Sequence, residues 1–304
     1  MQTFHANGKL LITGEYLVLQ GAKALAVPLN KGQQLTIGHS GLPGLQWQAT
    51  TPSGAWFDVE MDAQLNLIHS SDVAKAKTLQ HLLIKARQQK PDVISKLQQT
   101  TVQTHLEFDP LWGWGSSSTL LHLLHQWLDI DPYGLMDETF GGSGYDIACA
   151  GADQPILYNR HWQQKPEIEP VSFNPPFIHK IGLVYLNKKQ NSSSQVKSFL
   201  KSQQPDQGLI DDISTLATAF INTTSISDFD KLIRRHEELI SEATRLIPVQ
   251  KLLFEKFPGA VKSLGAWGGD FALFVSEMDF QISKKWFHNN GYPIVLPFKE
   301  VIKT

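Results

Sequence analysis

A glycine- and serine-rich segment at residues 112–118, Trp-Gly-Trp-Gly-Ser-Ser-Ser, has the residue types that bind phosphate. Glycines let the backbone approach an anion closely, and a helix beginning near Ser116 would point its first N–H groups at that anion. A serine hydroxyl there could also ligate the Mg²⁺ that accompanies a nucleotide. The alternative is a simple turn in which Ser116 caps the helix, and the loop alone does not exclude it.

One carboxylate, Asp146, follows a second glycine-rich turn at residues 141–144 and stands among small and apolar residues. Carboxylates are seldom placed in such surroundings without a partner. Asp146 could orient or deprotonate a substrate hydroxyl for attack on a phosphate. The alternative is an aspartate that caps the next helix.

Two further segments could contribute to the same chemistry. Lys9 is the only lysine within an apolar strand, where it could stabilise the charge of a transferring phosphoryl group or extend its ammonium to solvent. Residues 265–271, Gly-Ala-Trp-Gly-Gly-Asp-Phe, precede a strand. Their small side chains could bring the backbone close to a ligand, or they could form only a tight turn.

Hydrophobic periodicity predicts the elements that must position these residues. The predicted strands cover residues 10–18, 34–37, 102–108, 181–186 and 271–275. The predicted helical regions cover residues 73–97 with an interruption at Pro91, 116–128, and 211–257 with a break near Pro248. The order strand, glycine-containing loop, helix around residues 102–128 favours an anion-binding loop.

The length of 304 residues favours two domains over one hydrophobic core. A polar, proline-containing stretch at 161–176 is the best candidate linker. We therefore predict an N-terminal domain at residues 1–165 and a C-terminal domain at residues 166–304.

Composition limits the partners and the compartment. Twenty-seven basic and 29 acidic residues give a net charge of −2 without a basic block, so no nucleic-acid partner is expected. Cys149, the only cysteine, fits a reducing compartment. The N-terminus lacks a signal-peptide pattern and no apolar run could span a bilayer, so we expect a cytoplasmic protein without a membrane partner.

Several common sites are excluded by their motifs. No segment matches the phosphate loop G-x-x-x-x-G-K-S/T, and Ser118 occupies the last glycine position of the dinucleotide-binding pattern. No G-x-S-x-G elbow of a serine hydrolase is present. His122 and His125 share a helix, but no third metal ligand is evident from the sequence.

Taken in order, residues 6–16, 113–117 and 265–270 resemble the three motifs of the GHMP kinases. This superfamily is named for galactokinase, homoserine kinase, mevalonate kinase and phosphomevalonate kinase. The resemblance implies an α+β fold with an N-terminal βαβ domain similar to a ribosomal protein and a ferredoxin-like C-terminal domain. It also implies that ATP and a small-molecule substrate bind between these domains.

The resemblance assigns roles to residues matching the family's motifs. It makes Asp146 and Lys9 catalytic. It assigns nucleotide contacts to Gly113, Trp114, Gly115, Ser116, Ser117, Ser118, Gly268 and Gly269. It assigns substrate contacts to Glu15, Tyr16, Gly144, Lys188, Ser192, Ser193 and Ala266. Ser117 is the expected Mg²⁺ ligand; Leu135 stands near the family's second ligand, a glutamate, so Glu138 or Asp137 is expected to substitute.

Two tryptophans depart from the family pattern. Trp114 replaces a leucine of the phosphate loop and Trp267 replaces a glycine of the third motif. The two indoles could stack on a base or pack on each other, and either arrangement would reshape the nucleotide pocket.

Together these features predict an ATP-dependent kinase of a small metabolite, with phosphomevalonate or mevalonate as the leading acceptor. Residues 14–16, 142–148 and 268–270 look most similar to phosphomevalonate kinases. The alternatives are a metabolite-sensing protein on the same fold and a mevalonate diphosphate decarboxylase. A homodimer is compatible with the sequence, which does not fix the oligomeric state.

Overall fold

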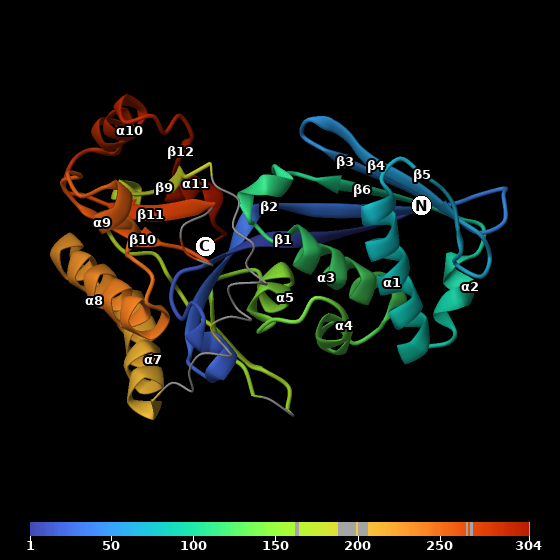
Figure 1. Ribbon diagram of the computed structural model, residues 1–304, viewed down its shortest axis with the longest axis horizontal. Helices are drawn as coiled ribbons and strands as arrows, with labels where there is room; N and C mark the ends of the chain where they lie inside the picture. The colour runs from blue at the N-terminus through green and yellow to red at the C-terminus, as the bar shows by residue number, and fades with distance from the viewer. Residues whose placement is uncertain (162–163, 188–198, 200–205, 266, 268–269, 304) are drawn as a thin grey trace. The chain divides into compact units, whose positions relative to one another are not determined.

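The computed structural model forms two compact units of mixed α and β structure, so the predicted α+β class is confirmed (Figure 1). It describes residues 1–161, 164–187, 199, 206–265, 267 and 270–303. Unit 1 contains Met1–Gly8, Lys31–Pro110 and Trp114–Gly151. Unit 2 contains Lys9–Asn30, Leu111–Gly113 and Ala152–Thr304.

The unit boundaries differ from a single division near residue 165. Strands β1 (Gln2–Leu11) and β2 (Ala24–His39) are long, and each contributes residues to both units. A shift in composition can indicate a linker between two units. It cannot indicate that one continuous strand contributes residues to both units, as β1 and β2 do.

Unit 1 is built on a sheet whose strands alternate between buried and exposed residues, as β3 and β6 do. β3 and β6 run parallel to each other, whereas β2 with β6, β3 with β4, and β4 with β5 run antiparallel. The strand order is β5 (Leu67–Ser70), β4 (Gly54–Met61), β3 (Leu45–Thr51), β6 (Thr100–Leu106) and β2, with which β1 also pairs.

The helices of unit 1 share one hydrophobic core with this sheet. Apolar residues of the strands, such as Trp47 and Val102, lie in one cluster with Leu82 and Leu124 of the helices. The predicted break at Pro91 is confirmed, because two helices occupy the 73–97 region. The helices are α1 (Val73–Gln89), α2 (Val93–Leu97), α3 (Ser116–Leu128), α4 (Pro132–Thr139) and α5 (Tyr145–Ala150).

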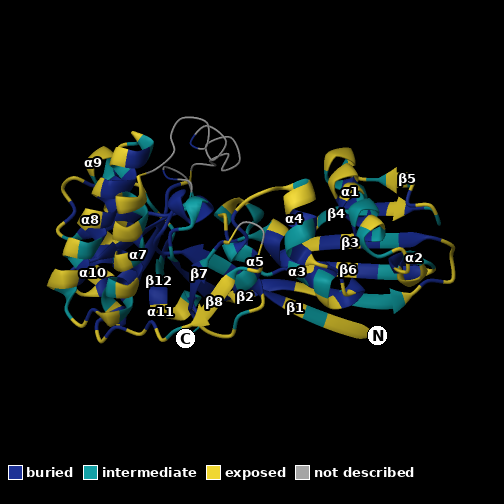
Figure 2. Ribbon diagram, turned by 90° about the horizontal axis from the view of Figure 1, so that it is seen from below, coloured by how far each residue is buried: buried dark blue, intermediate teal, exposed yellow. Residues whose placement is uncertain are grey.

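Unit 2 contains a four-stranded antiparallel sheet, and the residues of its first three strands are all buried (Figure 2). Its order is β10 (Ala260–Ser263), β11 (Phe271–Val275), β9 (Ile181–Tyr185) and β12 (Val295–Pro297). Its helices are α7 (Gln207–Asn222), α8 (Ile226–Thr244), α9 (Val249–Leu253), α10 (Phe280–Asn289) and α11 (Phe298–Val301). Strand β7 (Ile156–Asn159) pairs with the first residues of β2 and with β8 (Glu167–Pro170).

The predicted strand at residues 10–18 is wrong in its second half. β1 ends at Leu11, and Leu17–Gln20 form a short 3₁₀ helix. Gly14 and Tyr16 have φ values of 87° and 63°, which no strand accommodates.

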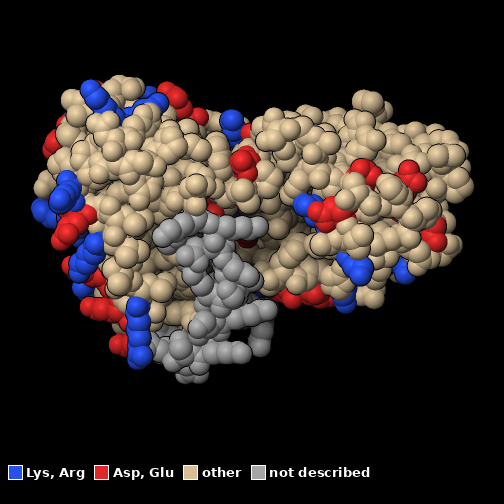
Figure 3. Space-filling model, turned by 45° about the horizontal axis from the view of Figure 1, so that its top comes forward, with Lys and Arg blue, Asp and Glu red and all other residues tan. Residues whose placement is uncertain are grey.

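Basic and acidic side chains are interspersed on the face shown in Figure 3, in keeping with the near balance of charge. An anionic ligand would therefore have to be bound by local groups. Within the described part of the chain, no helix is long and apolar enough to cross a membrane.

Candidate functional site

The loop before α3 has the backbone of an anion-binding loop. Gly113 and Gly115 have φ values of 68° and 94°, and Gly115 is the N-cap of α3. A glycine cap has no side chain to bond the first amides, and the first helical bond runs from Thr119 N–H to Gly115 C=O. The amides of residues 116–118 therefore precede the helical ladder, where a phosphate can accept from them. Ser116 is not the N-cap, so the simple capping alternative fails.

The hydroxyls of this loop have different environments. Ser118 is buried, and its Oγ donates to Gly115 C=O at 2.9 Å. Thr119 Oγ1 lies 3.0 Å from Ser116 C=O and 2.7 Å from Gln33 Oε1. Ser117 is exposed at the helix terminus. Ser118 and Thr119 therefore hold the loop in shape, and Ser117 is the accessible hydroxyl.

An aromatic pocket of about 310 Å³ lies beside the loop within unit 1. Ser116 and Ser117 line it on one side, and Trp56 and Phe57 contribute rings at a centroid distance of 5.6 Å. The other lining residues are Gln33, Trp47, Ala74, Lys75, Thr78, Leu79, Thr104, Leu120 and Phe140. Sequence reasoning missed this pocket because its walls come from separate strands and helices. Trp56 and Phe57, adjacent in one strand, were the available signal.

Asp146 lies in the first turn of α5, which belongs to unit 1 and packs against α3. The N-cap of α5 is Gly144, with a φ of 83°, so Asp146 is not the cap. Its side chain is partly exposed, and Oδ1 accepts from Ile147 N–H at 3.1 Å. A ligand can therefore reach this carboxylate.

The contact between α3 and α5 is close at the C-terminal end of α5. A Cβ on Gly151 would clash with the imidazole of His122. Burial lowers the pKa of His122 to about 4, with a smaller contribution from His125, so the ring is neutral at pH 7. His122 thus has a packing role. Among the described residues, no group of three or more His, Cys, Asp or Glu side chains could hold a metal ion.

Trp114 and Trp267, which depart from the family pattern, are both buried in hydrophobic surroundings. Trp114 is 2% exposed and packs edge-on against Phe108 at 5.7 Å in unit 1. Trp267 is 3% exposed and belongs to a cluster of unit 2 that includes Tyr16. The indole of Trp114 faces the interior, so its contribution to an anion site would come from its backbone.

Lys9 lies on β1 and is partly exposed, within unit 2. Tyr16 is buried, and its ring packs on Phe199 at 5.2 Å. Burial and the charge of Glu15 raise the pKa of Tyr16 above its ordinary value, so its phenol stays neutral.

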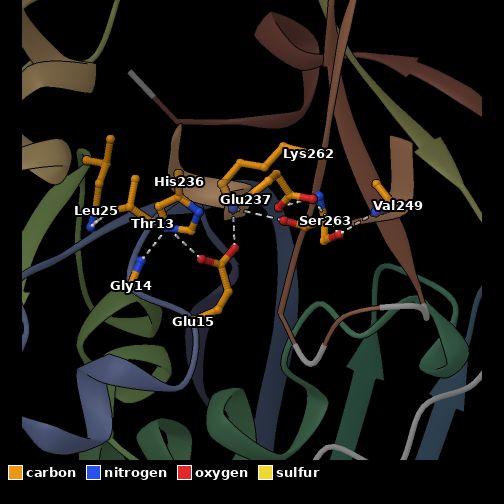
Figure 4. A network of polar contacts seen from close by, with 9 residues as sticks. All are labelled: Thr13, Gly14, Glu15, Leu25, His236, Glu237, Val249, Lys262 and Ser263. Atoms are coloured by element: carbon orange, nitrogen blue, oxygen red, sulfur yellow. Dashed lines mark hydrogen bonds and ion pairs between the residues drawn. The ribbon is translucent and has the colours of Figure 1, made fainter. Parts of the chain in front are cut away.

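Glu15 is fully buried in a polar network of unit 2 (Figure 4). Its Oε1 accepts from Lys262 Nζ at 2.5 Å, and its Oε2 lies 3.1 Å from His236 Nε2. Burial raises the pKa of Glu15, but Lys262 and His236 outweigh burial and bring it below its ordinary value. Glu15 is therefore ionised, and its carboxylate faces interior groups.

The third glycine-rich segment begins directly after this network. Gly265, Trp267 and Asp270 have φ values of 59°, 54° and 53°. A Cβ on Gly113 would clash with the carboxylate of Asp270, which places that carboxylate against the first glycine of the loop before α3. Sequence reasoning did not select Asp270 as a site residue.

Other predicted site residues fall outside the described part or have local partners. Ala266, Gly268, Gly269, Lys188, Ser192 and Ser193 lie outside the described residues. Glu138 of α4 forms an ion pair with Lys85 at 3.1 Å, and Leu135 is completely buried. Glu138 as a metal ligand remains a prediction.

Comparison with solved structures identifies the fold. A Streptococcus pneumoniae phosphomevalonate kinase in complex with phosphomevalonate and AMPPNP matches with a TM-score of 0.72 and 15% identity, over 97% of this chain and 99% of that chain. An L. major mevalonate kinase in complex with R-mevalonate matches with a TM-score of 0.65 and 17% identity, over 97% of this chain and 94% of that chain. A Lactococcus lactis galactokinase complexed with galactose matches with a TM-score of 0.63 and 10% identity, over 99% of this chain and 93% of that chain.

No protein-family model matches the chain, and no curated protein does. The structural matches show that the chain has the two-domain fold of the GHMP kinases, at 10 to 17% sequence identity to these neighbours.

Proposed function

We propose that the protein is an ATP-dependent kinase that transfers the γ-phosphoryl group to a small metabolite. The observation that carries this proposal lies within unit 1. There, the uncapped N-terminus of α3 adjoins an aromatic pocket, and a helix packed on α3 holds an accessible carboxylate. The fold shared with solved mevalonate, phosphomevalonate and galactose kinases supports the same conclusion.

The aromatic pocket suits the base of ATP. Purines stack on aromatic rings, and Ser116 and Ser117 at the pocket's edge lead directly into the amides of the anion loop. A nucleotide with its base beside Trp56 and Phe57 would therefore direct its phosphates to the N-terminus of α3. AMPPNP, an ATP analogue, accompanies phosphomevalonate in the Streptococcus pneumoniae structure.

Residues of the loop and of α5 would have different roles in the reaction. The amides of residues 116–118 would bind the phosphates, and Asp146 would orient or deprotonate the acceptor. Lys9 would offset the negative charge that develops during transfer. The exposed hydroxyl of Ser117 fits an Mg²⁺ ligand, and Mg²⁺ would supply neutralisation of the phosphate oxygens.

We propose phosphomevalonate or mevalonate as the acceptor. The two structural neighbours named for these acceptors were solved with phosphomevalonate and with R-mevalonate bound. Gly144, placed directly before the helix of Asp146, remains a proposed substrate contact. We further propose that the protein acts in the cytoplasm.

The test is an ADP-release assay with mevalonate, phosphomevalonate, homoserine and several sugars, with carbon dioxide measured in parallel. Replacement of Asp146 by Asn should lower kcat by about 100-fold or more, because the amide cannot accept a proton. Asp129→Asn is the matched control, since Asp129 is exposed beyond the C-terminal end of α3 and pairs with Lys90.

Each alternative has its own outcome in this assay. Wild-type turnover by Asp146→Asn would contradict the role of Asp146. Carbon dioxide release would identify a decarboxylase, and nucleotide binding without ADP release would favour a sensing protein.

A further inference from the structure

Two consecutive residues of helix α8 hold two segments that are far apart in the sequence. His236 Nε2 accepts from Gly14 N–H at 3.1 Å, at the end of the first motif. Glu237 accepts from Ser263 N–H at 3.1 Å and from Ser263 Oγ at 2.9 Å, at the end of β10. The Glu15–Lys262 pair then joins these two segments directly (Figure 4).

Lys262 provides the positive charge that compensates the buried carboxylate of Glu15. Burial and Lys262 lower the pKa of His236, so its ring is neutral and its Nε2 lone pair receives the N–H of Gly14. Glu15 Oε2 lies 3.1 Å from His236 Nε2, and no hydrogen-bond donor to Oε2 is found among the described residues. Lys262, which donates to Oε1, does the most to offset the burial of the Glu15 charge.

Stability alone does not account for a pair of this kind. Glu15, Lys262 and His236 are each 0% exposed. Dehydrating two charges offsets most of their attraction, and apolar residues of the same volume often stabilise a fold as well. A buried ion pair does, however, impose one relative position on the two chain segments that carry it.

Both joined segments contain strained backbone within four residues of the network. Tyr16 follows Glu15 with a φ of 63°, and Trp267 follows Ser263 by four residues with a φ of 54°. Both rings lie in one hydrophobic cluster of unit 2. Such conformations persist only where several contacts fix them, and they concentrate at functional segments.

We propose that Glu15 and Lys262, supported by His236 and Glu237, are positioning residues that hold the segment at residues 14–16 and the end of β10 at Ser263 in one arrangement. They act on the proposed phosphoryl transfer through these segments and do not touch the reacting atoms. This inference rests on the proposed function, since its kinetic consequence needs the kinase reaction.

The central variant is the double replacement Glu15→Gln with Lys262→Met, which removes both charges together. Glutamine keeps the length and shape of the glutamate side chain, and methionine fills most of the lysine's volume. The control is Lys180→Met with Glu277→Gln, an exposed ion pair of the same unit. A second variant, His236→Leu, removes the acceptor of Gly14 N–H and the imidazole beside Glu15, and it leaves the Glu15–Lys262 pair in place.

Kinetic constants for ATP, thermal melting and amide exchange of Gly14 are measured for each protein, with kinetics taken well below each melting midpoint. We expect the double variant to melt cooperatively and kcat to fall about 10- to 100-fold, because small displacements of site segments slow transfer strongly. The Gly14 amide should exchange at least about tenfold faster in both network variants. The control pair should stay within about twofold of wild type.

A double variant that is folded and keeps wild-type kcat, KM for ATP and Gly14 exchange would overturn the proposal. If the double variant does not fold, His236→Leu decides by the same three measurements. If the wild-type protein releases no ADP with any acceptor, the proposed function fails, while the exchange measurements still decide whether the network couples the two segments.

Discussion

Glu15 illustrates how a side chain predicted to contact substrate can face the protein interior. Its place in Gly-Glu-Tyr predicted a substrate contact, whereas its carboxylate lies 2.5 Å from Lys262 Nζ, 247 residues away in the chain. No local pattern joins such distant residues, so the pairing could not be predicted from the sequence. The burial of Glu15 favours a positioning role over direct contact.

Glu237 should make the stability of the protein depend on pH near neutrality. Burial raises its pKa to about 7 from an ordinary value of 4.5, and Lys262 only partly opposes this shift. Between these values the folded chain binds more protons at this site than the unfolded chain, so the free energy of unfolding falls as the pH rises. The stabilisation is complete below pH 4.5 and is lost as the pH passes about 7.

Urea denaturation at pH 6.5 and 7.5 isolates this effect. His236 has a lowered pKa and contributes the opposite slope, mainly below its ordinary value of 6.5. Between these two pH values, the free energy of unfolding of the wild type should fall by up to about 1 kcal/mol more than that of Glu237→Gln, which cannot ionise. Glu238→Gln, at the exposed next position, should keep the wild-type slope. Equal slopes for Glu237→Gln and wild type would rule out a titrating Glu237.

At the scale of elements, hydrophobic periodicity and the positions of proline and glycine predicted those helices and loops that depend on neighbouring residues alone. The break at Pro91, the helix at residues 116–128 and the glycine loop before it are confirmed. The strand at residues 10–18 failed because positive φ at Gly14 and Tyr16 overrides the apolar alternation. The aromatic pocket depends on how strands and helices pack, and this information is not present in any one segment.

Replacement of Gly113 by Ala should reduce both stability and turnover. Its φ of 68° is strained for alanine, and the new Cβ would displace the carboxylate of Asp270. Strain at such a position is worth about 1 to 2 kcal/mol, and the displaced loop should lower kcat by about tenfold or more.

The matched control for this prediction is Gly291→Ala. Gly291 also has a positive φ, 89°, but a Cβ there would meet no atom within 4 Å. It should lose similar stability, measured by chemical denaturation, while retaining kcat. Equal kcat losses in the two variants would show that lost stability, and not the contact with Asp270, lowers turnover.

At the scale of the whole molecule, nucleotide binding should appear as thermal stabilisation. A ligand that binds only the folded chain adds about 2.7 kcal/mol when its concentration is 100 times its Kd. ATP with Mg²⁺ should therefore raise the melting temperature, and removal of Mg²⁺ by EDTA should reduce this increase. The two-unit fold makes calorimetry preferable to a single spectroscopic probe, because the units need not unfold together.

The same melting measurement tests which groups of the nucleotide base the pocket recognises. Rings supply much of its wall, and the amide oxygen of Gln33 is already bonded to Thr119 at 2.7 Å. Stacking accepts any purine, and discrimination requires a polar group that the wrong base would leave unpaired. ITP and GTP should therefore raise the melting temperature nearly as much as ATP, with apparent Kd values within about tenfold. Inorganic triphosphate, which has no base, should raise it less, and stabilisation by ATP alone would show that the pocket recognises the amino group of adenine.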